Sequence, residues 1–179
     1  MASKRGLESS QPLGPGALQG NAKFATNVAL LMLRLALGWT FVFHGSQKCF
    51  GAFGAEGMFE KLAEGLQQMG MPGFLPIRVW AYMAAYGELI GGVTVLLGLL
   101  ARLGSIPIIV TMAVAIAKVH GSQGFSLEHM GYEYCLNLMA MAIVVLLAGP
   151  GLISVDALIF KRGLWARGPQ PLDQPARRG

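Results

Sequence analysis

The sequence is poor in charged residues. Only 13% of its 179 residues are charged, whereas soluble domains carry about 25%. Hydrophobic residues make up 54% of the chain, and a soluble domain of about 150 residues still exposes roughly 30% of its unfolded surface. A soluble core of this size has no room for so much apolar surface. The composition therefore excludes an ordinary soluble domain and predicts a membrane protein in contact with the lipid bilayer.

Cysteine and metal-binding patterns are equally scarce. The two cysteines, Cys49 and Cys135, are too few for a disulfide framework or a four-cysteine metal site. The three histidines show no HxxxH spacing, so we expect neither a metal site nor a haem. Both cysteines fall near the predicted outer ends of helices. There they either form a disulfide or remain reduced as small apolar side chains.

The basic residues form no stripe interleaved with aromatic residues, so we expect no nucleic-acid partner. The net charge of +5 comes mainly from the two ends of the chain. Residues 1–24 are predicted to be a disordered tail and residues 161–179 a basic C-terminal tail. The polar lead-in and Arg34 within the first apolar run do not resemble a signal peptide, so we expect that run to be a retained membrane segment.

Four long apolar runs lie between the tails, at about residues 25–43, 80–100, 103–119 and 134–148. A membrane-spanning helix needs about 20 apolar residues, and runs this long and unbroken exclude the strands of a barrel. The sequence therefore predicts an all-α fold, an integral membrane four-helix bundle over residues 25–160. Four spans place both termini on one side, and the Lys and Arg excess there predicts a cytoplasmic location for both.

The first outer loop and the second run carry two further patterns. The segment "EGMFEKLAEGLQQM" places its apolar residues on one helical face, which predicts an amphipathic helix lying at the membrane interface. This helix is either a surface cover over the bundle or a lid over a ligand site. Gly87 and Gly91 allow a close helix approach, either within the chain or in a homo-oligomer.

Two ionisable residues lie inside the apolar runs. At 1.5 Å per residue, Arg34 and Glu88 both fall near the middle of the bilayer, where a lone charge costs about 2.5–3.5 kcal/mol. We therefore expect an Arg34–Glu88 ion pair, which acts either as a structural clamp or as part of a functional site.

Other polar residues gather toward the outer side, where they mark the membrane interface or line a pocket that opens outward. Glu88 and His44 are the candidate catalytic residues. The candidate ligand-binding residues are Arg34, His44, Lys48, Glu88, Glu133 and Asn137.

Three segments of the chain, and the order in which they occur, resemble the DoxX family of small bacterial membrane proteins. These segments are "RLALGWTFVFHGSQK", "GELIGGVTVLLGLLAR" and "EYCLNLMAMAIVVLLAGPGLISVD", and they cover most of residues 30–160. The resemblance implies a four-helix fold in the bacterial cytoplasmic (inner) membrane and association with membrane redox complexes. It also implies that Arg34, His44, Lys48, Glu88 and Glu133, together with Arg102 and Asp156, occupy the family's recurrent polar positions.

Three functions compete at this point. The first is a redox-associated subunit of a membrane oxidoreductase complex that binds a quinone-like head group, with His44 donating a hydrogen bond to a carbonyl and Glu88 relaying a proton. Arg34 would then tune the pKa of Glu88, and apolar walls would hold the tail. The chain has no flavin, nicotinamide or iron–sulfur motif, so electrons would come from the quinone or from a membrane or periplasmic redox partner. The alternatives are a non-catalytic scaffold or assembly factor and a small-solute or proton-coupled transporter.

Overall fold

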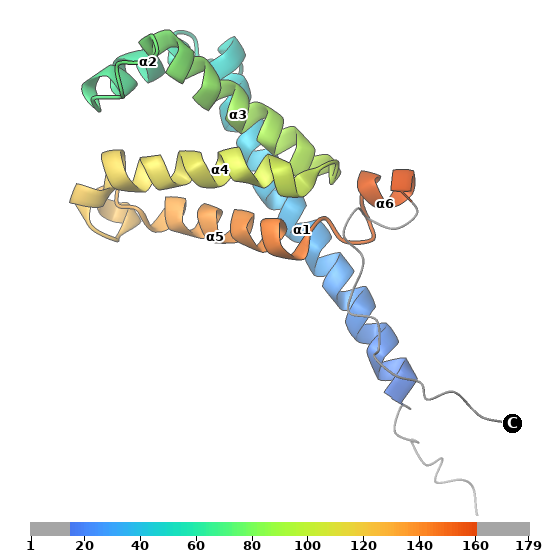
Figure 1. The fold of residues 1–179 in the computed structure, drawn as a ribbon. Coiled ribbons are helices and arrows are strands. Elements are labelled where there is room, and N and C mark those ends of the chain that lie inside the picture. The colour runs from blue at the N-terminus through green and yellow to red at the C-terminus, as the bar shows by residue number, and fades with distance from the viewer. Residues whose placement is uncertain (1–14, 161–179) are drawn as a thin grey trace, which may run out of the picture.

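The computed structural model describes residues 15–160, and this part of the chain consists of helices and connecting loops without strands (Figure 1). The predicted all-α class is therefore confirmed. The helices are α1 (Pro15–Phe50), α2 (Met58–Gln68), α3 (Ile77–Leu97), α4 (Ala101–Ala115), α5 (Glu133–Ala148) and α6 (Val155–Phe160). A π-helical turn, η1 (Ile116–His120), extends α4 and leads into the 3-10 turns η2 (Gly121–Gln123) and η3 (Leu127–His129).

Three helical segments within the described residues are long and apolar enough to cross a membrane: Gly20–Phe50, Ile77–Leu97 and Ala101–Gln123. Helix α5 is apolar but shorter, with 16 residues, which span about 24 Å. Large apolar side chains such as Trp39 and Leu147 are exposed on these helices. This surface suits contact with lipid acyl chains, so the helices support a membrane protein, whereas four crossings stay a prediction.

Helix α1 extends beyond the predicted span at both ends. It begins at Pro15 rather than near residue 25, and it ends at Phe50 rather than near residue 43. Proline is tolerated in the first turn because its missing N–H has no intrahelical partner there. At the other end, Gly45 packs against the α3 backbone at Leu89, and this contact continues the helix past His44. Residues 1–14 and 161–179 lie outside the described residues.

Glycines set the contact between the antiparallel helices α1 and α3. A Cβ atom on Gly38 would lie 2.6 Å from the backbone nitrogen of Leu96, and one on Gly92 would lie 2.6 Å from that of Val42. Real Cβ atoms do not approach other atoms so closely, so only glycine allows these backbones to meet. The α1–α3 contact therefore has a fixed register.

Helices α3 and α4 pack against each other over the half of α3 that is nearer to the turn that joins them. Gly91 faces the Gly104 carbonyl, where an added Cβ would lie at 2.7 Å, and Gly87 faces Pro107. These glycines therefore serve packing within the chain, one of the two predicted uses. Toward the other end the two helices diverge (Figure 1). The turn itself contains Gly98 at φ 69° and Leu100 at φ 51°.

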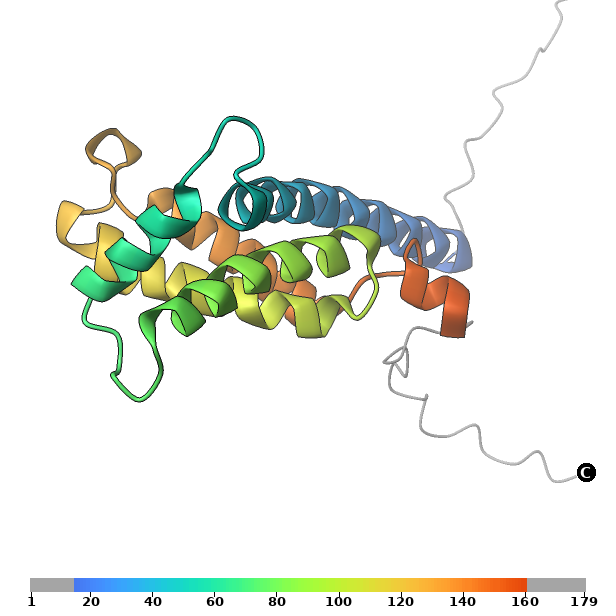
Figure 2. The same cartoon turned by 90° about the horizontal axis from the view of Figure 1, so that it is seen from above.

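Helix α2 forms over most of the predicted amphipathic segment and lies across the wide end between α3 and α4 (Figure 2). Its buried residues Ala63 and Leu66 pack on Ala81 of α3, with Leu62 and Trp80 beside them. The opposite face carries Glu60, Lys61, Glu64, Gln67 and Gln68, all exposed. The apolar face of α2 is therefore used to cover the other helices.

Replacing Gly92 with alanine should lower stability by about 1–3 kcal/mol, because the new methyl group overlaps the α1 backbone. Thermal unfolding in detergent measures the effect. Gly65→Ala is the matched control, because the nearest atom to a new Cβ there is 3.9 Å away and alanine is the better helix former by about 1 kcal/mol. Equal melting temperatures for the two variants would contradict the close α1–α3 contact.

Candidate functional site

A cavity of about 640 Å³ occupies the wide end between α3 and α4. Helices α1, α2 and α5 contribute the remaining walls. Most of the lining is apolar, and it includes Leu62, Leu66, Trp80, Met83, Val110 and Leu138. A few polar side chains also reach it, among them His44, Lys48, Glu88, Thr111, His120 and Tyr134. A largely apolar cavity of this size with a few polar groups is typical of small-molecule sites.

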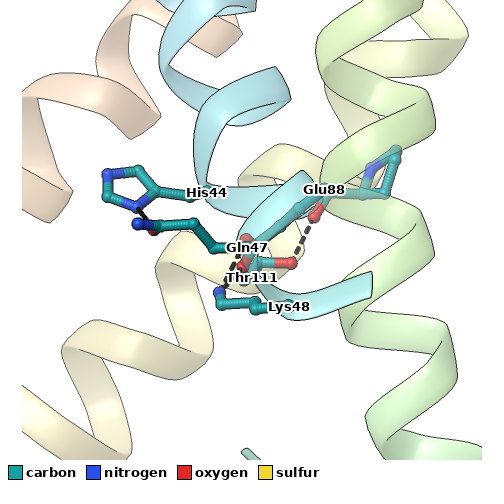
Figure 3. A network of polar contacts seen from close by, with 6 residues as sticks. His44, Gln47, Lys48, Glu88 and Thr111 are labelled. Carbon is teal, nitrogen blue, oxygen red and sulfur yellow. Dashed lines mark hydrogen bonds and ion pairs between the residues drawn. The ribbon is translucent and has the colours of Figure 1, made fainter. Parts of the chain in front are cut away.

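The centre of the polar group is an ion pair between helices α1 and α3 (Figure 3). Lys48 Nζ lies 2.5 Å from Glu88 Oε1 and 2.6 Å from Oε2. The Glu88 side chain is 2% exposed and that of Lys48 is 24% exposed. Coulomb attraction is strong in such a poorly solvated place, and neither charge is buried alone.

The helix register explains why these two residues meet. Glu88 lies one turn before Gly92, on the face of α3 that contacts α1. Lys48 lies three residues after Gly45, which packs on Leu89. The continuation of α1 to Phe50 thus brings the lysine opposite the glutamate.

His44 lies one turn before Lys48, and its ring Nδ1 is 3.2 Å from Oε1 of Gln47 (Figure 3). An amide oxygen only accepts hydrogen bonds, so this assignment of the amide places the proton on Nδ1. The Nε2 atom of the neutral ring is then an acceptor. At the edge of the cavity, His44 can therefore accept a hydrogen bond from a ligand hydroxyl.

Arg34 does not pair with Glu88, so that prediction is wrong. Arg34 is 1% exposed, and its Nη2 donates to the Ile153 carbonyl at 2.7 Å. Asp156 is the opposite charge that acts on it. The register places Arg34 beside Gly98, ten residues and about 15 Å along α3 from Glu88. Arg34 also cannot tune Glu88 as predicted, because Lys48 is the cation bound to that carboxylate.

The buried Asp156 holds the α3–α4 turn. Both of its carboxylate oxygens accept from the Leu100 N–H at 3.1 Å, and its own N–H donates to the Gly98 carbonyl at 3.1 Å. We call Arg34, Asp156 and the turn 98–100 the turn cluster. It lies at the narrow end between α3 and α4, away from the cavity. Of the six predicted ligand-binding residues, Arg34 is therefore placed in a structural setting.

The other predicted residues divide between the cavity and its surroundings. His44, Lys48 and Glu88 line the cavity together. The Glu133 carboxylate instead accepts from the Leu127 N–H at 3.3 Å and holds the preceding loop, and Asn137 is exposed on α5. The structure thus brings three of the six together.

Both cysteines are free in the structure, so of the two alternatives for them the reduced form is the one seen. Cys135 is buried and lines the cavity, whereas Cys49 is partly buried near the end of α1. No three His, Cys, Asp or Glu side chains among residues 15–160 gather in a way that could hold a metal ion.

Sequence reasoning missed Thr111, His120 and Tyr134, which also line the cavity. The Thr111 hydroxyl donates to the Pro107 carbonyl at 2.9 Å, and a hydroxyl within an apolar run gives no specific signal. His120 ends the π-helical turn η1, is partly buried, and its ring Nδ1 contacts the Met130 carbonyl at 2.6 Å. A π-turn changes the direction in which each later side chain points, and no pattern in the sequence predicts this turn.

Comparison of the sequence with known proteins identifies a family. The family model DoxX matches residues 29–121, which include α2, α3, α4 and most of α1. A protein of Haemophilus influenzae named "Uncharacterized protein" is 26% identical over 137 residues, which cover 76% of this chain and 86% of that one.

A protein of Bacillus subtilis named "Putative oxidoreductase CatD" is 30% identical over 134 residues, which cover 75% of this chain and 89% of the relative. No solved structure shows a significant match. The family match and the shared length agree with the helices and the resemblance described above. This chain therefore belongs to the DoxX family of membrane proteins.

Proposed function

We propose that this protein is a redox-associated subunit of a membrane oxidoreductase complex and that its cavity binds a quinone-like head group. The observation that carries the proposal is the Lys48–Glu88 pair at the wall of a largely apolar cavity. A quinone needs this combination, because its ring oxygens form hydrogen bonds while its tail is apolar. The name of the Bacillus subtilis relative supports a redox role.

The residues of the cavity fit such a ligand. A bound quinone would supply the electron- and proton-accepting couple, with electrons from a partner protein. Glu88 holds or releases a proton at its carboxylate, which receives both of its hydrogen bonds from the Lys48 ammonium. The orientation of Gln47 supports His44 as an acceptor of a hydroxyl proton through Nε2. This differs from the expected role of His44 as a donor to a carbonyl.

The proposal includes a membrane topology. All four apolar helices, α1, α3, α4 and α5, would cross the bacterial inner membrane, with both termini in the cytoplasm. The start of α1 and helix α6 lie at the same end of the structure, which agrees with an even number of crossings (Figures 1 and 2). The cavity would then open toward the periplasmic side, with α2 at the outer interface.

Titration of the purified full-length protein with an isoprenoid quinone tests the function. We expect Glu88→Gln and His44→Ala each to weaken binding by about tenfold, the equivalent of one charge-assisted hydrogen bond. Glu60→Gln on the exposed face of α2 is the matched control and should leave binding unchanged. Absence of quinone binding, with a stable partner recovered by crosslinking that carries all cofactors, would favour the non-catalytic scaffold.

A further inference from the structure

The lining of the cavity includes side chains on the outer surface of the helices. Met83 of α3 is 57% exposed, and Ile106 and Val110 of α4 are 45% and 56% exposed, yet all three line the cavity. Side chains that line the cavity and are also exposed lie where it opens toward the surface; these three form an apolar opening between α3 and α4, apart from the exposed lining residues His44, Val119 and Tyr134. We call the opening bordered by Met83, Ile106 and Val110 the α3–α4 gap.

The α3–α4 gap lies within two segments that are able to cross the membrane, Ile77–Leu97 and Ala101–Gln123. Its border carries only apolar side chains, whereas the polar lining residues His44, Lys48 and Glu88 come from α1 and the α1-facing side of α3. The phase that meets the gap is therefore the hydrocarbon of the bilayer.

The apolar face of α2 covers another side of the cavity. Leu62, Leu66 and Met69 of α2 line the cavity, and Leu66 and Ala63 are buried against α3. A solute arriving on the α2 side would have to displace this apolar helix face, whereas a membrane-dissolved molecule reaches the cavity through the α3–α4 gap without doing so.

We propose that the ligand enters sideways from the lipid through the α3–α4 gap and that it is an amphiphile with a long apolar tail. The polar head lies against Lys48 and Glu88, and the tail leaves between Met83 and Val110 into the bilayer. This inference rests on the proposed function for the identity of the head group, but the route of entry is independent of that identity. A route through the α3–α4 gap also favours ligands with a long apolar tail over ligands without one.

Binding of two quinones to full-length protein in lipid nanodiscs tests the tail preference. One quinone carries an isoprenoid tail and the other has a methylated ring without a tail. Val110→Trp and, separately, Met83→Trp fill the gap from its two sides. We expect about tenfold weaker binding of the tailed quinone, the equivalent of about two buried methylene groups. The tailless quinone should change by less than about twofold.

Leu103→Trp is the matched control on the same helix. Leu103 is 61% exposed and does not line the cavity, so this variant adds the same bulk to the lipid-facing surface and should leave both affinities unchanged. Equal losses for the tailed and tailless quinones in Val110→Trp and Met83→Trp, or no loss for either, would overturn the gap as the tail path.

The native thiol of Cys135 provides a readout that does not depend on quinone binding. Cys135 lines the cavity, and Cys49→Ser removes the competing thiol from the described residues. We expect a maleimide with a long alkyl chain to modify Cys135 faster than a sulfonated maleimide does. Val110→Trp should slow the alkyl probe by about tenfold, and Leu103→Trp should not slow it.

The two readouts separate the two proposals. If no quinone binds but Val110→Trp still slows the alkyl maleimide, the proposed function fails and the route through the gap stands. If quinone binds and Val110→Trp leaves the alkyl probe unaffected, the proposed function stands and the route is wrong. Faster modification by the sulfonated maleimide, or no modification of Cys135 by the alkyl probe, would also show that the route is wrong.

Discussion

Lys48→Met should destabilise the protein by about 3–5 kcal/mol, the cost of leaving a buried charge without its partner. The Glu88 side chain is 2% exposed and its carboxylate receives both hydrogen bonds from the Lys48 ammonium. Methionine keeps the length of the lysine stem, so the change removes the charge and leaves the packing of α1 nearly intact. Thermal unfolding in detergent measures the loss.

A double variant makes this result specific to the pair. Lys48→Met combined with Glu88→Leu removes both charges, and most of the lost stability should return because no ion remains buried alone. The exposed pair of Arg78 and Glu60, 3.4 Å apart, is the matched control. Arg78→Met should change stability by less than about 1 kcal/mol. Additive losses in the double variant would contradict a direct interaction between Lys48 and Glu88.

Asp156→Ala should destabilise the protein by at least about 1–3 kcal/mol, because it removes a buried carboxylate that holds the turn and whose charge acts on the buried Arg34. Arg34 is 1% exposed and Asp156 is 4% exposed. The same change leaves the Leu100 N–H without its acceptor, and an orphaned buried donor costs about 1–3 kcal/mol. Unfolding in detergent again measures the effect.

Asp156→Asn separates these two contributions. Asparagine retains an oxygen that accepts from Leu100 but removes the charge, so its stability should fall between those of the native protein and the alanine variant. Combining Arg34→Met with Asp156→Asn should recover part of the loss. If Asp156→Asn is as stable as the native chain, the charge of Asp156 does not compensate Arg34.

The hydrophobic pattern was sufficient to locate the longer helices, but not the short helix α6. Each of the four apolar runs became a helix, and the amphipathic segment became α2. The observed ends of the helices differ from the predicted ends where a single residue stops a helix. Helix α3 covers Ile77–Leu97 rather than residues 80–100, because Gly98 adopts the left-handed conformation that ends helices. A hydropathy pattern varies over several residues and does not report such a stop.

The candidate site was predictable only in part, because it depends on how the helices slide along one another. His44, Lys48 and Glu88 were recognised as polar residues within or beside apolar runs, and they meet at the cavity. Arg34 was assigned to Glu88 from estimated depths alone. Depth from the start of an apolar run is uncertain by the error in that start, whereas the glycine contacts between α1 and α3 set the register atom by atom.

Because α3 and α4 diverge from the turn cluster, a small rotation there produces a larger displacement at the other end of α3. Helix α3 has 21 residues, a length of about 32 Å, so a rotation of about 5° at the turn cluster moves its far end by about 3 Å. Glycine contacts tie α3 to α1, and both would swing together relative to α4 and α5. We therefore expect substitutions of Asp156 or Arg34, although these residues are remote from the cavity, to change its width.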